Sequence, residues 1–363
     1  MPSTVENDEL SLSIEKMKAE INRKKKKKKK TIKIIVAVFL VIILSFAAVI
    51  TAAWFRGRSA AKSEVSIDEN AVVIEKGPAP VIRNSGKTIT YKGTTYTFNS
   101  NIVTFAFIGI DKNSMGLKNG IVGTGGQSDT IAVLAYDLSD GSSKVIVIPR
   151  ETMADIDTFD TKGGYVDIKK AQICLAYAYG DGAKSSCEKT INSISRLLFG
   201  MKINHYVTLD VDGIPALNDA VGGVNVTCLE TIGQFTKGEK ITLYGNDAVS
   251  YVRNRRKDTV DADSARRERQ KQYIKAFVSK ALKKVRKDFT VVPRLWSTAS
   301  DYMITDMTLN DATYLASVAL SRNFTFGSFS TVPGSYTMGE TYAEYYADND
   351  ALFELVLDTF YTK

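Results

Sequence analysis

Three apolar stretches in close succession decide the fold: VTFAFIGI at residues 103–110, TIAVLAY at residues 130–136 and KVIVI at residues 144–148. Each stretch is rich in β-branched and aromatic residues, which favour strands. None alternates strictly between apolar and polar residues, as expected for strands that are covered on both faces. Two further strands are predicted at residues 206–211 and 224–228.

Helical patterns lie between and after these strands. Residues 264–286 carry apolar residues at the spacing of one helix face, and a shorter helix is predicted at residues 186–199, before Gly200. Thr308-x-x-Asp311 opens another helix, and residues 342–360 are predicted as the last one. Strands interspersed with helices predict an α/β fold, a three-layer sandwich with a central mixed β-sheet flanked by helices. A hairpin is predicted around Lys92-Gly93.

A single transmembrane helix is predicted at residues 34–55, where 22 residues carry no charge. This length spans the ~30 Å hydrocarbon core of a bilayer. A secretory signal peptide is the alternative, but the apolar run exceeds the roughly 7–15 residues of such a segment, and Ala52-Ala53-Trp54 is a poor cleavage site. The pattern therefore favours an uncleaved signal-anchor in the cell membrane.

The charge distribution predicts the orientation of this anchor. Residues 1–33 hold 11 Lys and Arg against 5 acids, a net charge of +6, whereas the rest of the chain has 37 against 35. The positive-inside rule then places the N-terminus in the cytoplasm, with the run from Lys24 to Lys30 able to touch anionic lipid. The pI of 9.1 reflects this tail and does not indicate a nucleic-acid partner.

Four segments follow from these observations. They are a cytoplasmic basic tail at residues 1–33, the transmembrane helix at 34–55, an extracellular stalk at 56–86 and an extracellular domain at 87–363.

The numbers of cysteines and histidines limit the kinds of metal site and catalytic mechanism that the sequence predicts. Cys174 and Cys187 lie close enough in sequence to form a disulfide, with Cys228 left over; three buried free thiols are the open alternative. The single histidine, His205, is interpreted as a structural or surface residue, which disfavours a zinc site and a Ser-His-Asp mechanism. A Walker loop is also absent.

Polar residues gather where predicted strands begin and end. Asp111 follows the first strand, Asp129 opens the second and Arg150 closes the third. Loops at strand ends of an α/β sheet are the usual place for a ligand crevice. Taken alone, Asp111 and Asp129 could each be a capping residue.

A second group of polar residues surrounds the start of the helix at residues 264–286. Arg253 and Arg255 precede it, and the motif Asp263-x-x-Arg266-x-x-Arg269-Gln270 opens it. We place Arg253 and Arg255 at a strand end. Guanidinium groups can each grip two phosphate oxygens, and carboxylates can hold a Mg²⁺ that bridges such oxygens. Both groups together predict phosphoryl-transfer chemistry, although Arg255 and Arg256 could also be a solvated pair.

These motifs together resemble the LytR-CpsA-Psr family of bacterial cell-envelope enzymes. The resemblance rests on seven stretches in order: Phe107-Ile-Gly-Ile-Asp111, Ser128-Asp129-Thr130, Ile148-Pro-Arg150-Glu-Thr152, Ala176-Tyr-Ala-Tyr-Gly180, Val221-Gly-Gly-Val-Asn-Val226, Tyr251-Val-Arg253-x-Arg255 and Asp263-x-x-Arg266-x-x-Arg269-Gln270. It implies a long hydrophobic pocket for a polyprenyl chain and an arginine-lined mouth for its pyrophosphate, with Mg²⁺ or Mn²⁺. It also implies transfer of the linked glycopolymer (teichoic acid, capsule or another secondary polymer) as glycan phosphate onto peptidoglycan.

The resemblance also implies roles for individual residues. Asp111 and Asp129 would hold the metal. Arg150, Asp263 and Arg266 would be catalytic, with Asp263 as a base or as an orienter of the arginines. The pyrophosphate would be bound by Arg150, Arg253, Arg255, Arg266, Arg269 and Gln270.

The chain departs from the family pattern at three places. Gln127 stands where the family commonly has Arg, Glu151 where Asp is usual, and Gln172-Ile-Cys174 where Lys-x-Asn is usual. The loss of a cation at Gln127 favours a different class of function, a scaffold that binds polyprenyl pyrophosphates without turning them over. A phosphatase that uses water as acceptor is a third alternative.

Overall fold

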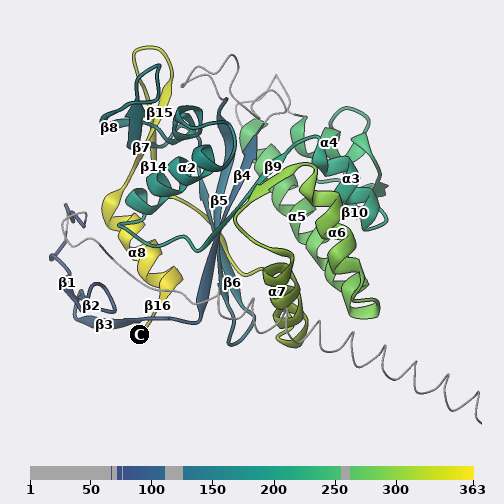
Figure 1. Cartoon of the computed structure of the whole chain (residues 1–363), viewed down its shortest axis with the longest axis horizontal. Helices are drawn as coiled ribbons and strands as arrows, with labels where there is room; N and C mark the ends of the chain where they lie inside the picture. Colours follow the sequence, from purple (N-terminus) through teal and green to yellow (C-terminus); the bar gives the residue numbers. More distant parts are fainter. Residues whose placement is uncertain (1–66, 68–71, 76, 111–125, 255–261) are drawn as a thin grey trace, which may run out of the picture. The chain divides into compact units, whose positions relative to one another are not determined.

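Figure 1 shows the computed structural model, which describes residues 67, 72–75, 77–110, 126–254 and 262–363. In this part of the chain, a central six-stranded sheet has the order β12-β9-β4-β5-β6-β13. The bounds of its strands, in that order, are β12 (Met303–Thr305), β9 (His205–Asp210), β4 (Ile102–Ile110), β5 (Ser128–Asp137), β6 (Ser143–Ile148) and β13 (Phe329–Thr331).

The sheet is mixed, as predicted. Strands β4, β5 and β6 are antiparallel neighbours, whereas β9 runs parallel to β4 and β13 runs parallel to β6. The three apolar stretches that predicted the fold are these three neighbouring strands. Because neighbouring strands are antiparallel, the end of β4, the start of β5 and the end of β6 lie at the same edge of the sheet.

One face of the sheet is closed by helices that bury one side against it. The helices α2 (Lys184–Leu197) and α8 (Asn349–Phe360) contribute Ile194 and Phe353 to the main core, where both are fully buried. Ala106 and Ile108 of β4 belong to the same core, since alternate residues of a strand point to the same face. This packing explains why the central strands are apolar without strict alternation.

The other face is approached by α5 (Ala262–Lys287), whose Lys275 Nζ lies 4.8 Å from the centre of the Phe329 ring in β13. Around α5 pack the helices α3 (Gly213–Ala220), α4 (Asn246–Arg253), α6 (Val291–Ser300) and α7 (Leu309–Ser321). A second core forms where α4 and α5 meet the hairpin of β10 (Val224–Thr227) and β11 (Lys240–Leu243).

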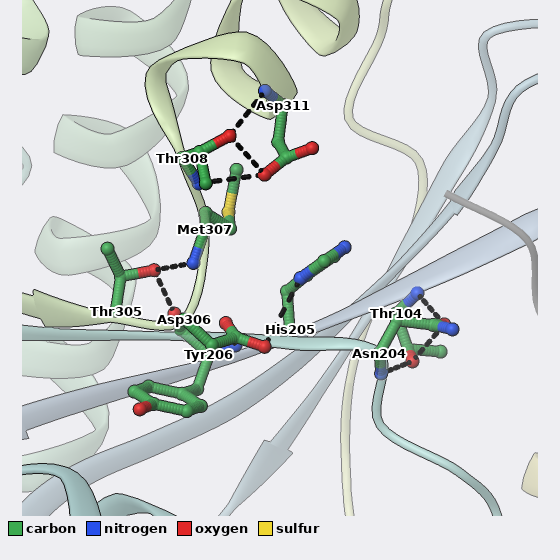
Figure 2. Close-up of polar contacts among 9 residues, drawn as sticks. All are labelled: Thr104, Asn204, His205, Tyr206, Thr305, Asp306, Met307, Thr308 and Asp311. Atoms are coloured by element: carbon green, nitrogen blue, oxygen red, sulfur yellow. Dashed lines mark hydrogen bonds and ion pairs between the residues drawn. The ribbon is translucent and has the colours of Figure 1, made fainter. Parts of the chain in front are cut away.

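A polar network ties the start of β9 to the segment between β12 and α7 (Figure 2). Asp306 accepts a hydrogen bond of 2.9 Å from the Tyr206 backbone N–H, and its other oxygen lies 3.3 Å from His205 Nδ1. Thr308 and Asp311 form the predicted capping box of α7. His205 is buried and lies opposite Phe105 in the parallel pairing of β9 with β4. Its position is therefore that of a structural residue.

The structure corrects the last predicted helix. Residues 343–347 form strand β15 (Ala343–Ala347), which pairs with β14 (Gly334–Met338), and α8 begins only at Asn349, after the N-cap Asp348. Helix α2 also ends earlier than predicted, at Leu197 and not just before Gly200.

The predicted hairpin belongs to a small second sheet. The strands of this sheet are β1 (Val81–Arg83), β2 (Thr88–Tyr91), β3 (Thr94–Phe98) and β16 (Tyr361–Thr362). Its turn residues Lys92 and Gly93 have φ values of 49° and 77°, the left-handed conformation that a two-residue type I′ turn requires. Strand β1 and the buried Ile67 lie within the predicted stalk and pack on this unit.

The membrane prediction concerns a different part of the chain. No helix among the described residues is long and apolar enough to cross a bilayer. The predicted transmembrane helix at residues 34–55 lies outside them, as does the basic tail.

Candidate functional site

Two of the predicted site residues meet at one edge of the central sheet. The register pairs Ile110 of β4 with Ser128 of β5, and Ile131 of β5 with Ile148 of β6. The end of β4, the start of β5 and the end of β6 therefore share this edge, so the polar residues predicted at strand ends come together here. Asp111 would follow directly after Ile110 but lies outside the described residues.

The Arg150 side chain contacts several polar side chains at this edge of the sheet. Its Nη1 forms an ion pair with Asp129 Oδ1, and its Nη2 donates to Gln127 Oε1. Its Nε lies 3.6 Å from Glu151 Oε1. The Arg150 side chain remains 35% exposed and that of Asp129 39% exposed, so both can still reach a ligand in solvent.

The departures from the family pattern gather around this same guanidinium. Cys174, at the start of the 3-10 helix η4 (Ile173–Tyr179), has its Sγ 4.0 Å from Gln127 Oε1 and 3.9 Å from Gln172 Oε1. Its backbone N–H donates to the Arg150 carbonyl. Burial raises the pKa of the Cys174 thiol to about 11. Cys174, Cys187 and Cys228 are all buried free thiols, so Cys174 and Cys187 form no disulfide.

The described residues supply one of the two predicted metal ligands. Within them, no group of three or more His, Cys, Asp and Glu side chains is arranged to hold a metal ion. Mg²⁺ at phosphate sites is usually held by one or two carboxylates together with phosphate oxygens and waters, so it needs no such cage. Asp129 fits this pattern because only its Oδ1 takes part in the ion pair with Arg150.

The second group of predicted residues lies where α4 meets α5. Arg253 is the last residue of α4 and is exposed, so the prediction that it lies at a strand end is wrong. Arg255 and the side chain of Asp263 lie outside the described part of the chain. The sequence missed α4 because its eight residues leave too little periodicity to separate a helix from a strand.

Arg269 occupies a buried structural position at this junction. Its side chain is 0% exposed, and its Nε donates to Glu230 Oε1 at 2.8 Å. Its Nη1 and Nη2 donate to the carbonyls of Tyr251 and Asn254. Gln270 Nε2 donates to the carbonyl between them, that of Val252, at 3.1 Å. The last turn of α4 has carbonyls without helical partners, and these two side chains satisfy them.

A residue that the sequence reasoning passed over also faces the site. Arg267 is half-buried in α5, next to the half-buried Arg266. Burial raises the pKa of Tyr345 in β15, and the nearby charge of Arg267 lowers it. Tyr345 also donates its backbone N–H to the Glu151 carbonyl. Arg267 lies seven residues before Ile274, two helical turns along the same face, and this spacing could have identified it.

The sheet face below this edge carries an apolar row that is incompletely covered. Phe107 of β4 pairs across the ladder with Val207, on one side, and with Ala132, on the other; Ala132 in turn pairs with Val147. Phe107 is 41% exposed, although it lies on a central strand, and the other three are half-buried. On α5, Ile274 is likewise 44% exposed. Phe107 and Ile274 are thus large apolar side chains that the described part of the fold leaves exposed.

The described geometry joins three features at one edge of the sheet: an arginine–carboxylate pair, a helix start rich in arginine and an incompletely covered apolar face. The model of the LytR_cpsA_psr family matches residues 70–358. The chain belongs to this family. The family assignment agrees with the resemblance predicted from the motifs and accounts for their order along the chain.

Two relatives in the LytR_cpsA_psr family are named polyisoprenyl-teichoic acid–peptidoglycan teichoic acid transferase TagU. The protein from Halalkalibacterium halodurans is 33% identical over 160 residues, 43% of this chain and 48% of the relative. The one from Enterococcus faecalis is 32% identical over 206 residues, 56% of this chain and 61% of the relative. These matches span about half to three-fifths of each relative.

The fold agrees with solved structures of the family. The crystal structure of Bacillus subtilis TagV matches with a TM-score of 0.53 and 23% identity, over 72% of this chain and 96% of that one. At this identity the likeness establishes the mixed α/β fold with a central sheet flanked by helices.

Proposed function

We propose that this chain transfers a polyprenyl-pyrophosphate-linked glycopolymer, as glycan phosphate, onto peptidoglycan and releases polyprenyl phosphate. The observation that carries the proposal is the position of Arg150, paired with Asp129 at the sheet edge, beside the apolar row that includes Phe107. Such a site presents a cation and a carboxylate to a pyrophosphate while an apolar surface receives its lipid tail. The names of the TagU relatives support teichoic acid as the polymer.

In this proposal, an acceptor hydroxyl attacks the phosphorus nearer the sugar. A new P–O bond forms to the acceptor, the bridging P–O bond of the pyrophosphate breaks, and polyprenyl phosphate leaves with the bonding electrons. Asp263 takes the hydroxyl proton; in the alternative, Asp263 orients the arginines and the leaving polyprenyl phosphate takes the proton. Arg150, Arg253, Arg255 and Arg266 neutralise charge on the leaving phosphate. Bound Mg²⁺, held by Asp129 and Asp111, would neutralise the remaining phosphate oxygens.

Arg269 and Gln270 receive a different role from the one that the resemblance implies. Their side chains donate to carbonyls at the end of α4, immediately around Arg253. We therefore assign them as positioning residues that fix where α4 ends and where Arg253 begins to project.

The proposed location follows from the substrate. A polyprenyl chain is confined to a bilayer, so the enzyme must meet it at a membrane. The proposed anchor at residues 34–55 and the basic run from Lys24 to Lys30 would hold the domain at the outer surface of the cell membrane, where peptidoglycan lies.

The test is turnover by the full chain in mild detergent. Polyprenyl-pyrophosphate-linked glycan, peptidoglycan fragments and Mg²⁺ are supplied, and polyprenyl phosphate and glycan-bearing fragments are followed by mass spectrometry. Arg253→Ala should lower turnover more than about 100-fold, the effect of removing a preorganised charge donor. Arg294→Ala is the matched control, because Arg294 is an exposed arginine in an ion pair on α6. An unchanged rate in Arg253→Ala contradicts the assignment.

A binding scaffold is the second candidate function, favoured by the neutral Gln127 beside Arg150. The same experiment separates the two functions. Tight binding of the lipid without release of polyprenyl phosphate, with either Mg²⁺ or Mn²⁺, would establish the scaffold. Release with water as the acceptor would instead establish a phosphatase.

A further inference from the structure

Helix α5 carries a one-sided charge along its length. Residues 265–287 hold ten lysines and arginines against one acid, Glu268. Four of the lysines follow a spacing of four residues, interrupted only by the exposed Ser279: Lys271, Lys275, Lys283 and Lys287. Because residues four apart lie on one side of a helix, these lysines form a row along α5. Among the described residues, Lys271 alone in this row has a carboxylate partner, Glu268 at 2.8 Å.

A loop rich in phenylalanine lies beside α5. Residues 323–329 carry three half-buried rings, those of Phe324, Phe326 and Phe329. The first two rings meet edge to face with centroids 5.0 Å apart, and the last two have centroids 5.5 Å apart. Helix α5 contacts both ends of the loop, because Lys275 Nζ lies 4.8 Å from the Phe329 ring and Arg286 Nη2 donates to Asn323 Oδ1 at 3.1 Å.

The helix and the loop together form one surface, which we call the basic-aromatic surface. Its members are Lys275, Lys283, Arg286 and Lys287 of α5 with Phe324, Phe326 and Phe329 of the loop. Residues 312–339 on the loop side contain no acid and one cation, the exposed Arg322. On the helix side, Ile274 is 44% exposed and directly precedes Lys275. The surface therefore offers cations and apolar atoms to the same occupant.

The basic-aromatic surface lies at the end of the central sheet opposite the arginine site. The Thr325 N–H donates to the Gly141 carbonyl and the Gly327 N–H to the Ser143 carbonyl, which fixes the loop beside the start of β6. Strand β6 runs from Ser143 toward Arg150 and has six residues, about 20 Å at about 3.3 Å per residue. Val147, a member of the incompletely covered apolar row, lies between the two ends.

We propose that the basic-aromatic surface docks on an anionic lipid bilayer. Lysine and arginine side chains are attracted to anionic headgroups, and aromatic and aliphatic side chains enter the boundary between headgroups and acyl chains. A soluble polyanion would engage the same cations but offers no apolar atoms to the phenylalanine rings or to Ile274, so the combination favours a bilayer.

The docking stands on this surface alone, and only its use in catalysis rests on the proposed function. A docked domain would hold the apolar row close to the bilayer. The polyprenyl tail could then stay near the membrane while its pyrophosphate reaches Arg150 at the other end of β6.

The test measures contact between α5 and lipid in the full chain, reconstituted into nanodiscs of phosphatidylcholine with or without phosphatidylglycerol. A fluorescent label is attached through Ser279→Cys, and its quenching by doxyl-labelled lipid is recorded; the native cysteines are buried. Quenching at position 279 should rise when phosphatidylglycerol is present and fall again at high salt. Asn192→Cys is the matched control, because Asn192 is an exposed residue of α2, on the opposite face of the sheet, and its label should not respond.

Removal of charge gives the second measurement. Lys283→Gln combined with Lys287→Gln should lower the ratio of docked to undocked molecules about 25-fold, about fivefold for each lysine that faces anionic headgroups. Lys169→Gln combined with Lys170→Gln is the control, because it removes the same charge from exposed positions of strand β8 (Tyr165–Gln172). That control should leave the quenching unchanged.

Three results overturn the proposal: equal quenching at positions 279 and 192, quenching at 279 that does not depend on phosphatidylglycerol, and quenching that survives the loss of Lys283 and Lys287. Inorganic polyphosphate, added to the full chain in detergent, separates the other occupant. If it binds through these two lysines while phosphatidylglycerol leaves the label unquenched, the surface binds a polyanion instead. Because no lipid-linked glycan is present, failure of docking and failure of transfer are separate results.

Discussion

Arg150 and Arg269 belong to the same arginine-rich set of motifs, yet the structure gives them opposite surroundings. Arg150 lies in the turn after β6, is 35% exposed and pairs with Asp129 and Gln127. Arg269 lies inside the α4–α5 junction, is 0% exposed and donates to Glu230 and to two backbone carbonyls. The comparison teaches that one arginine-rich set of motifs contains both a guanidinium group that stays accessible to solvent and one that holds a helix junction together.

The largest effect is expected for the buried arginine, Arg269, and it should appear in the stability of the fold. Arg269→Ala should lower the free energy of unfolding by roughly 3–5 kcal/mol, because Glu230 and the end of α4 lose their buried partner. Urea denaturation measures this change. The control is Arg196→Ala, which breaks the partly exposed ion pair with Asp157 and should cost about 1 kcal/mol or less. A loss as small as that in Arg269→Ala would contradict its structural role.

Substitution of the exposed arginine, Arg150, should instead change the activity. Arg150→Ala should lower turnover more than about 100-fold, equivalent to about 3 kcal/mol of transition-state stabilisation. Its midpoint in urea should stay close to that of the unchanged protein, since the side chain is only partly buried. If Arg150→Ala unfolds the domain, or leaves turnover unaltered, the two arginines do not differ in the way described here.

A smaller effect is expected at Gln127, whose amide oxygen accepts from Arg150. Gln127→Glu keeps the shape of the side chain but adds a negative charge that competes with the pyrophosphate for Arg150. The KM for the lipid-linked donor should rise about tenfold, equivalent to roughly 1.4 kcal/mol, with little change in kcat. Steady-state kinetics at fixed ionic strength gives both constants. A lower kcat at constant KM would show that Gln127 acts on the chemical step.

The smallest effect concerns Cys174, which reports on the packing beside Arg150. Burial raises the pKa of its thiol to about 11, so at pH 8 nearly all of it is in the unreactive neutral form. Iodoacetamide should label Cys174 in the folded protein much more slowly than in urea. The Arg150→Ala variant should not label faster through the thiolate, because the Arg150 charge lowers the thiol pKa and its removal raises that pKa. Fast labelling of the unchanged protein would contradict this burial.

Much of the fold followed from local patterns. Strands β4, β5 and β6 are long apolar runs, the Lys92-Gly93 turn needs positive φ at two residues, and Thr308 with Asp311 caps α7 through contacts only three residues apart. Strand β15 was missed because its conformation depends on pairing with β14 and on the contact of Tyr345 with Glu151, nearly two hundred residues earlier in the chain. Non-local pairing of this kind overrides local propensity.

The sequence by itself determined the chemical repertoire of the protein: one run able to span a bilayer, three neighbouring apolar strands, and arginines and aspartates at their ends. These properties depend on composition and on spacing over a few residues, which local physics reads directly. Only the tertiary structure decided that Arg150 is partly exposed at the sheet edge while Arg269 is buried, and that three departures from the family pattern surround Arg150. Those outcomes depend on contacts between residues far apart in sequence, whose free energy exists only once the chain has folded.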